Sequence, residues 1–270
     1  MADLLLHSMA EFAPVILPLM DALHVRDTLE IGVEYGPLTR LLVDRARAAG
    51  GVHVGIDPAP KPEALEHFDN LHGVLCEGRS LEVLASLPAM DAYLVDGDHN
   101  HFTVLNELRL IAAAARITGR PFPLVLLHDI GWPCGRRDHY YSPDAIPPEH
   151  RHPHTWDLGM RPGDPGVWQG GMRGEGAYAV ALHEGGRGNG VLTAIEDFLK
   201  EAGDLAFFRI PAALGLGVLV DPLHASQAGS ILAPYHDNPL LERLERNRLE
   251  LYVRVIDWQD QAGAQAAPAR

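Results

Sequence analysis

The chain has 270 residues, 47% of them hydrophobic and 21% charged, so it can bury a full core, and we expect one large domain. Its formal net charge of −14 argues against general nucleic-acid binding, which needs a basic surface to replace phosphate counterions. The apolar runs are far shorter than the roughly 20 residues that span a bilayer. Two cysteines, Cys76 and Cys134, make neither a disulfide framework nor a metal knuckle.

The N-terminal stretch is apolar, and we expect a helical segment over residues 1–26. Asp3 and Glu11 break both the basic region and the continuous apolar region that a secretion signal needs. Together with the composition, this predicts a soluble, cytoplasmic protein.

Short apolar runs alternate with helix-like segments over residues 27–220, the expected main domain. The strand-like runs are Thr28–Gly32, Val52–Asp57, Gly73–Glu77, Ala92–Asp96 and Leu124–Asp129, and the helix-like segments are Pro37–Ala49, Ser80–Leu87 and Phe102–Arg116. Such alternation indicates parallel pairing with right-handed crossovers. We therefore expect an α/β fold with a Rossmann-like, doubly wound, mostly parallel sheet.

Residues 130–176 break this alternation and are rich in proline, glycine, histidine and aromatic residues, without a clear period. Long segments of this kind in compact domains are usually lids or binding loops, so we expect a mobile lid insertion here. Its aromatic residues suit a pocket for a small-molecule acceptor. Histidines such as His139 and His152 could act as bases or metal ligands, or could simply be solvated.

Beyond the lid, Val191–Glu201 has the pattern of an amphipathic helix, and Leu205–Ile210 with Leu216–Val220 that of a closing hairpin. Residues 221–270 are expected to hold a long charged helix, Pro239–Trp258, and a frayed tail from Gln259. Part of that helix forms an apolar stripe, which must be covered by its own domain or by a second copy; we predict a homo-oligomer. The stripe consists of Leu240, Leu241, Leu244, Leu251 and Val255.

The first strand runs into a glycine turn, in the sequence LEIGVEYG. Gly32 and Gly36 allow positive φ and a close backbone approach, and the acidic Glu30 precedes them. Asp57 ends the second strand about 20 residues later, where an acid can take ribose hydroxyls. The GxGxxG pattern is absent, which makes a nicotinamide dehydrogenase the weakest alternative.

Two later strands also end in polar residues. Because strand ends meet at one edge of a doubly wound sheet, we expect four side chains to converge, those of Asp96, Asp98, His128 and Asp129. Carboxylates suit Mg²⁺, and an added imidazole also tolerates Mn²⁺, Fe²⁺ or Zn²⁺. Alternatively, Asp98 or Asn100 only caps the next helix, and His128 is a packing residue.

At this point the chain resembles the class I S-adenosylmethionine-dependent methyltransferases, over residues 27–220. LEIGVEYG is similar to the motif that wraps the methionine part of the cofactor, and the segment CEGRSLEVL to the adenine side. The resemblance implies that Asp57 holds the ribose. The cofactor-binding set would be Glu30, Gly32, Gly36, Asp57, Ser80, Leu81 and Asp96.

The sequence VDGDH resembles the fourth-strand motif of magnesium-dependent sugar and natural-product O-methyltransferases. This implies that Asp96 binds metal and that Asp98 is a general base. Those enzymes carry an acidic pair after the fifth strand, whereas this chain has His128 and Asp129. The implied metal ligands are Asp96, His128 and Asp129, with Mg²⁺ as the expected ion, and the implied catalytic residues are Asp98 and His128.

The predicted function is metal-assisted O-methylation of a small-molecule hydroxyl on a sugar or natural product. An alternative is an enzyme of this fold that binds the cofactor but catalyses a non-methylating reaction such as cyclisation, elimination or hydroxylation. A non-catalytic subunit is disfavoured, because nothing structural demands Glu30, Gly32, Asp57 and Asp96 together. No nucleic-acid or membrane partner is expected.

Overall fold

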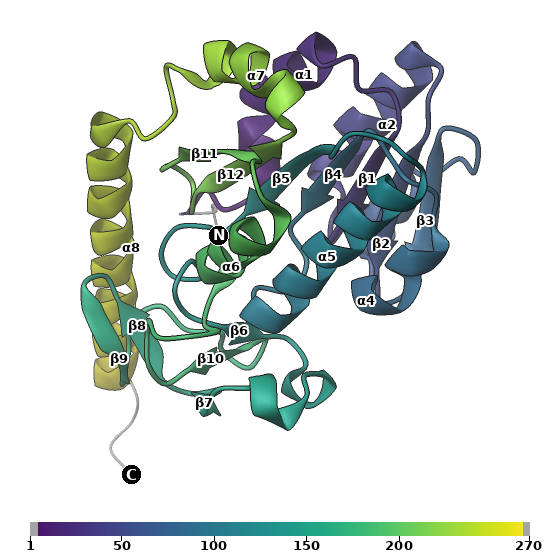
Figure 1. The fold of residues 1–270 in the computed structure, drawn as a ribbon. Helices are drawn as coiled ribbons and strands as arrows, with labels where there is room; N and C mark the ends of the chain where they lie inside the picture. The colour runs from purple at the N-terminus through teal and green to yellow at the C-terminus, as the bar shows by residue number, and fades with distance from the viewer. Residues whose placement is uncertain (1–4, 267–270) are drawn as a thin grey trace.

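A computed structural model of the protein describes residues 5–266. Its centre is a seven-stranded sheet in the order β11-β12-β5-β4-β1-β2-β3 (Figure 1). The strands β1 to β5 are parallel, whereas β12 runs antiparallel to both β5 and β11. The predicted fold class is therefore confirmed, including the antiparallel last strand. The strands are β1 Thr28–Ile31, β2 His53–Asp57, β3 Gly73–Glu77, β4 Ala92–Val95, β5 Leu124–His128, β11 Ala206–Ile210 and β12 Leu216–Val220.

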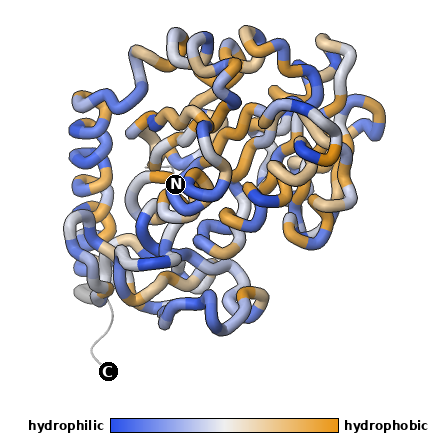
Figure 2. Tube along the Cα trace, in the orientation of Figure 1, coloured by the Kyte–Doolittle hydropathy of each residue, from blue (hydrophilic) through white to orange (hydrophobic). Residues whose placement is uncertain are grey.

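Helices cover both faces of this sheet (Figure 1), and its central strands consist mainly of hydrophobic residues (Figure 2), which are buried on both sides. Leu29 and Ile31 pack on the face of α5 and α6, and Leu94 on the face of α1, α2 and α7. The helices are α1 Ala13–Ala22, α2 Pro37–Ala49, α3 Pro62–Leu65, α4 Ser80–Val83, α5 His101–Ile117, α6 Val191–Ala202, α7 Ala225–Leu232 and α8 Pro239–Ala266, with short 3₁₀ turns at Met9–Phe12, Leu84–Ser86 and Pro222–His224.

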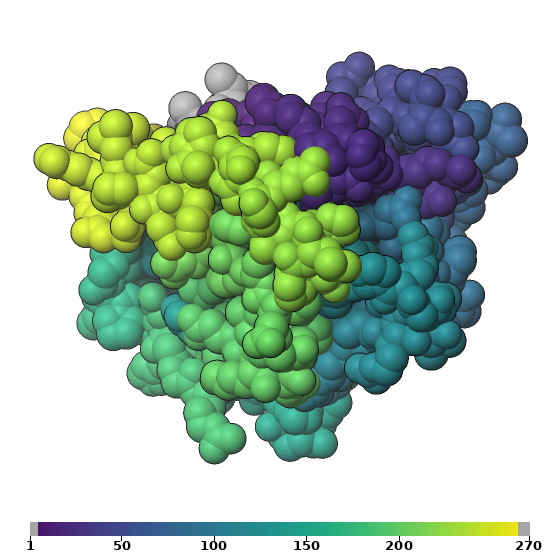
Figure 3. Space-filling view, turned by 45° about the horizontal axis from the view of Figure 1, so that its top comes forward, coloured from purple at the N-terminus to yellow at the C-terminus, as the bar shows by residue number. Residues whose placement is uncertain are grey.

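The apolar N-terminal region is covered by its own domain. Met9, Ile16 and Leu19 are buried in the core that α1 shares with α2 and α7. In the space-filling view, the purple N-terminal region lies beside the yellow-green C-terminal segment (Figure 3). Most of the large apolar side chains of this stretch are therefore covered within the chain itself.

The insertion at residues 130–176 is not a structureless loop, which corrects our expectation. Its strands β6 His139–Tyr140 and β7 His154–Thr155 flank β10 Ala179–Ala181, and β8 Gly159–Arg161 pairs with β9 Asp164–Trp168. Two 3₁₀ turns, Pro143–Ala145 and Pro148–His150, complete it. Strands of two to five residues are too short to give a visible period, so the sequence pattern could not reveal them.

A buried arginine holds this insertion in place. Arg137 is fully buried and donates to the backbone carbonyls of Ala181, Pro165 and Gly166 at 2.5, 2.8 and 3.0 Å. Burial lowers the pKa of its guanidinium. These bonds join β9 to β10 and replace the apolar core that such short strands cannot make.

The C-terminal helix α8 extends to Ala266, so the helix ends later than the predicted start of a frayed tail at Gln259. One side packs on the domain through the buried Leu249 and Val253, and Arg161 pairs with Asp257. The opposite side exposes much of the predicted apolar stripe. No helix within residues 5–266 is long and apolar enough to cross a membrane.

Candidate active site at the carboxyl ends of the strands

The glycine turn after β1 packs tightly against the turn after β4. Gly32 has φ +91°, and a Cβ there would lie 2.1 Å from the backbone oxygen of Asp96. Gly36, with φ +75°, begins α2, and its Cβ would come within 3.0 Å of Ala64. The glycines therefore let the chain approach itself, and any role in ligand approach comes in addition.

Asp57 organises that same turn. Its Oδ2 accepts the backbone N–H groups of Val33 and Glu34, both at 2.9 Å, and its Oδ1 accepts that of Ala59 at 2.7 Å. An ionised carboxylate has about four acceptor positions, so about one remains for a ribose hydroxyl. Asp57 lies at the predicted edge, but most of its hydrogen-bonding capacity is already used.

Glu30 is not brought together with these strand-end groups. Its Oε2 accepts from Thr39 Oγ1 at 2.5 Å and lies 3.2 Å from His53 Nε2, beneath helix α2. His53 Nδ1 in turn lies 2.9 Å from Thr28 Oγ1. The structure thus gives Glu30 an internal bracing role between β1, β2 and α2, and no contact at the sheet edge.

A second buried acid, which the sequence pattern did not reveal, lies near Ser80. Ser80 Oγ donates to Glu107 Oε1 at 2.5 Å, while Glu107 Oε2 is buried without a hydrogen-bond partner among the described residues. Burial raises the pKa of Glu107 to about 8. Leu81 follows Ser80 on α4 and is partly buried. Glu107 escaped prediction because its neighbours on α5 follow an ordinary helical pattern.

Asn100, and not Asp98, caps α5. Asn100 Oδ1 accepts the backbone N–H of Thr103 at 2.9 Å, whereas Asp98 Oδ2 accepts the Thr103 hydroxyl at 3.2 Å. Asp98 Oδ1 is buried and lacks a partner within residues 5–266. Burial raises the pKa of Asp98. The capping alternative therefore holds for Asn100, which leaves one Asp98 oxygen available.

Two histidines and two aspartates meet where β4 and β5 end. His128 Nδ1 lies 3.1 Å from Asp96 Oδ1 and 3.4 Å from Asp129 Oδ2. His99 Nε2 lies 3.4 and 3.0 Å from the same two oxygens. Asp96, His128 and Asp129 thus converge as predicted, and His99, the last residue of VDGDH, joins them.

The hydrogen bonding of His128 shows that this cluster needs a cation. His128 Nε2 lies 2.9 Å from the carbonyl oxygen of Ala213, so Nε2 carries a proton. A neutral His128 would then direct the Nδ1 lone pair at two carboxylates. Either a second proton or a metal ion must lie there. Burial lowers the pKa of His128, but the charges of Asp96 and Asp129 outweigh this and hold it well above 6.5.

The insertion closes over this cluster with aromatic rings. The ring of Tyr141 lies 5.9 Å from that of His99, and Tyr178 stacks on His139 at 5.1 Å. His152 is instead bonded to the Gly188 carbonyl at 2.8 Å, in the loop between β10 and α6. Of the two named candidate histidines of this segment, only His139 comes near the cluster.

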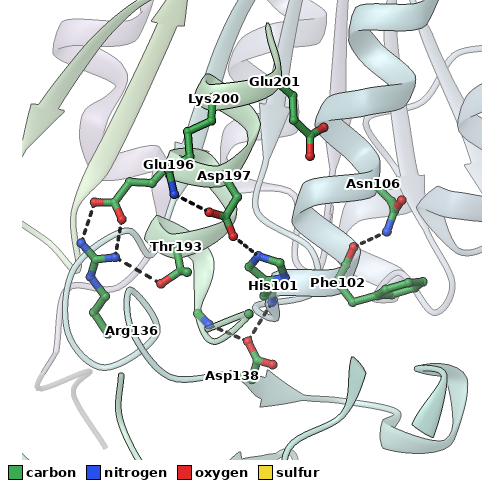
Figure 4. A network of polar contacts seen from close by, with 12 residues as sticks. His101, Phe102, Asn106, Arg136, Asp138, Thr193, Glu196, Asp197, Lys200 and Glu201 are labelled. Atoms are coloured by element: carbon green, nitrogen blue, oxygen red, sulfur yellow. Dashed lines mark hydrogen bonds and ion pairs between the residues drawn. The ribbon is translucent and has the colours of Figure 1, made fainter. Parts of the chain in front are cut away.

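A charged network fixes the insertion to the helices behind the site (Figure 4). Asp138 Oδ1 accepts the backbone N–H groups of His101 at 2.7 Å and Gly190 at 2.6 Å. Arg136 makes two bonds of 2.6 Å to Glu196 on α6. The start of α5, the start of α6 and residues 136–138 are therefore held as one unit beside the cluster.

Residues 29–130 match the family model described as a methyltransferase domain. The resemblance to the class I S-adenosylmethionine-dependent methyltransferases is confirmed. The matched stretch includes the glycine turn, Asp57, Ser80 and the Asp96–His128–Asp129 cluster. It ends where the insertion begins, so Cys134, His139 and Tyr141 lie beyond the matched domain.

Solved structures of similar fold include two O-methyltransferases. TomG from Streptomyces achromogenes, involved in tomaymycin synthesis and solved with S-adenosylmethionine, is 14% identical with a TM-score of 0.47, over 80% of this chain and 82% of that one. The enzyme from Bacillus cereus, in complex with S-adenosylhomocysteine, is 15% identical with a TM-score of 0.47, over 79% and 81%. No curated protein matches the chain by sequence.

Proposed function

We propose that this methyltransferase domain transfers the methyl group of S-adenosylmethionine to a hydroxyl oxygen of a small molecule, with help from a divalent ion. The observation that carries this proposal is the orientation of His128, whose Nδ1 faces two carboxylates, an arrangement that suits either a second proton on the ring or a metal cation, and the proposal takes the metal cation. An acceptor hydroxyl must lose its proton in this reaction, and such a cation is where its oxygen would be activated.

The cofactor fits the polar groups at the ends of β2, β3 and β4. Asp57 keeps an acceptor position for a ribose hydroxyl, and an unpartnered oxygen remains on Glu107 beside Ser80. When bound, S-adenosylmethionine supplies an already reactive methyl group. The chain then has to position the acceptor in line with it.

The divalent ion would be held by Asp96, His128 and Asp129, whose ligand atoms all lie within 4.8 Å of one another. Asp129 Oδ1 is buried and unpartnered among the described residues, which favours this donor set. When bound, the ion would lower the pKa of an acceptor hydroxyl and orient it.

Asp98 is the proposed base. Its free Oδ1 can accept the proton of the hydroxyl, and its burial-raised pKa brings it closer to the value that a base needs near neutral pH. Tyr141 and Tyr178 would line the acceptor side and keep water away from it.

The test is methyl transfer from isotopically labelled S-adenosylmethionine to a panel of catechol, sugar and phenol acceptors, with and without EDTA. Label in the product that is lost on chelation and restored by a divalent ion would support the proposal. Unlabelled but chemically altered product would favour the non-methylating alternative, and full activity in excess EDTA would remove the metal from the mechanism.

A further inference from the structure

Beyond the matched domain, a thiol lies close to the charged cluster. Cys134 is buried in the loop after β5, and its Sγ, a carboxylate oxygen of Asp129 and a ring nitrogen of His99 all lie within 4.8 Å of one another. We propose that His99, Asp129 and Cys134 form a thiolate-containing site for a zinc-class ion, and that this site selects Zn²⁺ over Mg²⁺.

The chemistry of the three donors points to that class of ion. Mg²⁺ binds oxygen ligands almost exclusively, whereas zinc accepts thiolate, imidazole and carboxylate together. Zinc bonds of about 2.0 to 2.3 Å place tetrahedral ligand atoms about 3.3 to 3.8 Å apart. Donor atoms that already lie within 4.8 Å of one another need only small movements to close around the ion. Three protein ligands would leave one position open for water or substrate.

A second observation points to a ligand here. Asp129 Oδ2 contacts His99 and His128, but Asp129 Oδ1 is buried with no hydrogen-bond partner among the described residues. A buried, unsatisfied carboxylate oxygen is costly unless it binds something. Asp129 also has φ +58°, which is uncommon outside glycine and is often seen at functional sites.

The loop that carries Cys134 is held in a fixed shape. A Cβ on Gly135 would lie 2.2 Å from the Ile130 carbonyl oxygen, so only glycine allows this tight return toward Asp129. The first backbone N–H groups of α6 also hold the loop. Val191 donates to the carbonyl oxygen of Cys134 at 3.0 Å, and Leu192 donates to that of Gly135 at 2.9 Å. The thiol is therefore positioned before any ion arrives.

His139 supports the thiol from behind. Its Nδ1 lies 3.4 Å from Cys134 Sγ, and its ring stacks on Tyr178. Such an outer partner orients a metal ligand. The rival explanation is a thiol–imidazole hydrogen bond with no ion.

Cobalt(II) titration of the chelator-treated full-length chain separates these explanations. Co²⁺ bound to thiolate gives an intense charge-transfer absorption in the near ultraviolet, which nitrogen and oxygen ligands do not produce. We expect this band to appear, to be displaced by Zn²⁺, and to survive an excess of Mg²⁺. Binding of cobalt without the band would overturn the proposal, as would no binding at all.

Matched variants assign the ligand. Cys134→Ser should remove the band and lower zinc affinity by more than about 10-fold, the scale on which even outer partners act. Cys76→Ser, at the other cysteine, on β3, should change neither. Asp96→Asn should retain the band, because Asp96 belongs only to the other ligand group. A band retained in Cys134→Ser would refute the assignment.

If Cys134→Ser fails to fold by circular dichroism, X-ray absorption of the zinc-loaded wild-type chain gives the same answer without a variant. One sulfur among the zinc ligands is the expected result, and a shell of only nitrogen and oxygen contradicts the site. None of these measurements depends on methyl transfer, so the proposed function and this site can fail separately.

Discussion

The two halves of the sheet edge satisfy their polar groups in different ways. At the end of β2, Asp57 is bonded to three backbone N–H groups, and Glu30, within β1, is bonded beneath α2 to Thr39 and His53. At the ends of β4 and β5, charged groups face one another, and oxygens of Asp98 and Asp129 lack partners among the described residues. The first half is complete without a ligand, whereas the second half is not.

This difference predicts what substitutions will do. Residues of the first half contribute to folding and binding at once, so changing them should lower stability as well as cofactor affinity. Residues of the second half form ion pairs with one another, and Asp98 and Asp129 each keep an oxygen without a partner among the described residues. Changing them should reduce the rate of methyl transfer more than cofactor affinity, with some loss of stability from the broken ion pairs.

The largest effect is expected from Asp129→Asn. The substitution keeps the size of the side chain but removes a ligand charge, so the rate of methyl transfer should fall by about 100-fold or more, the scale of general-base and metal catalysis. The melting temperature should also fall, because His99 and His128 lose the carboxylate charge that they share, but the variant should still fold. Steady-state rates and melting curves check this prediction. Asp144→Asn, which changes an exposed carboxylate of the insertion, is the control. A large loss of stability with normal activity would reverse the contrast between the two halves.

Asp57→Ala should instead lower the stability of the fold and the affinity for the cofactor together. It removes the acceptor of three backbone N–H groups, so the turn loses stability, and S-adenosylhomocysteine binding should weaken by about 2 kcal/mol, the scale for charged hydrogen bonds. Calorimetry and denaturant unfolding measure the two effects. Weaker binding at unchanged stability would mean that the backbone bonds matter less than their geometry indicates.

The sequence predicted the order of the main elements and most of the strand-end residues, because parallel strands have strong apolar patterns and their ends must meet. It could not predict that Glu30 turns beneath α2, since the direction of a side chain depends on partners such as His53 in another strand. Nor could it reveal how the insertion is organised, because Arg137 binds carbonyls, which have no sequence signature. Glu107 and Cys134 were missed for a related reason: single polar residues in apolar surroundings look like ordinary packing residues.

A smaller effect should come from Glu107, which lies between the two halves. Burial raises its pKa from 4.5 to about 8, so between these pH values the folded chain holds a proton that the unfolded chain has released. Stability from this group is therefore lost as the pH rises through that window, with a slope of at most about 1.4 kcal/mol per pH unit. Glu107→Gln has no such proton and should gain stability relative to the wild type between pH 5 and pH 8. The free energy of unfolding of both proteins is measured from pH 5 to pH 8. If the two curves run parallel, Glu107 is not held in its neutral form in the folded chain.

The smallest effect on the site is expected from the exposed side of α8, which carries none of the strand-end groups. Leu240, Leu244 and Leu251 are 62%, 56% and 50% exposed, so the domain leaves much of the predicted stripe uncovered. Arg243 and Glu250 flank Leu244 and Leu251, and two antiparallel copies of the helix would bring these opposite charges together.

We therefore expect a two-fold dimer through α8, with a mass near twice the 29.4 kDa of the chain by light scattering. Leu244→Glu should produce the monomer at micromolar concentration while leaving methyl transfer within about 2-fold, because the stripe adds no group to either half of the sheet edge. Leu223→Glu, at an exposed leucine away from α8, is the matched control. A wild-type chain that is already monomeric would show that these leucines are simply exposed, while a dimer that persists in Leu244→Glu would place the contact on another surface.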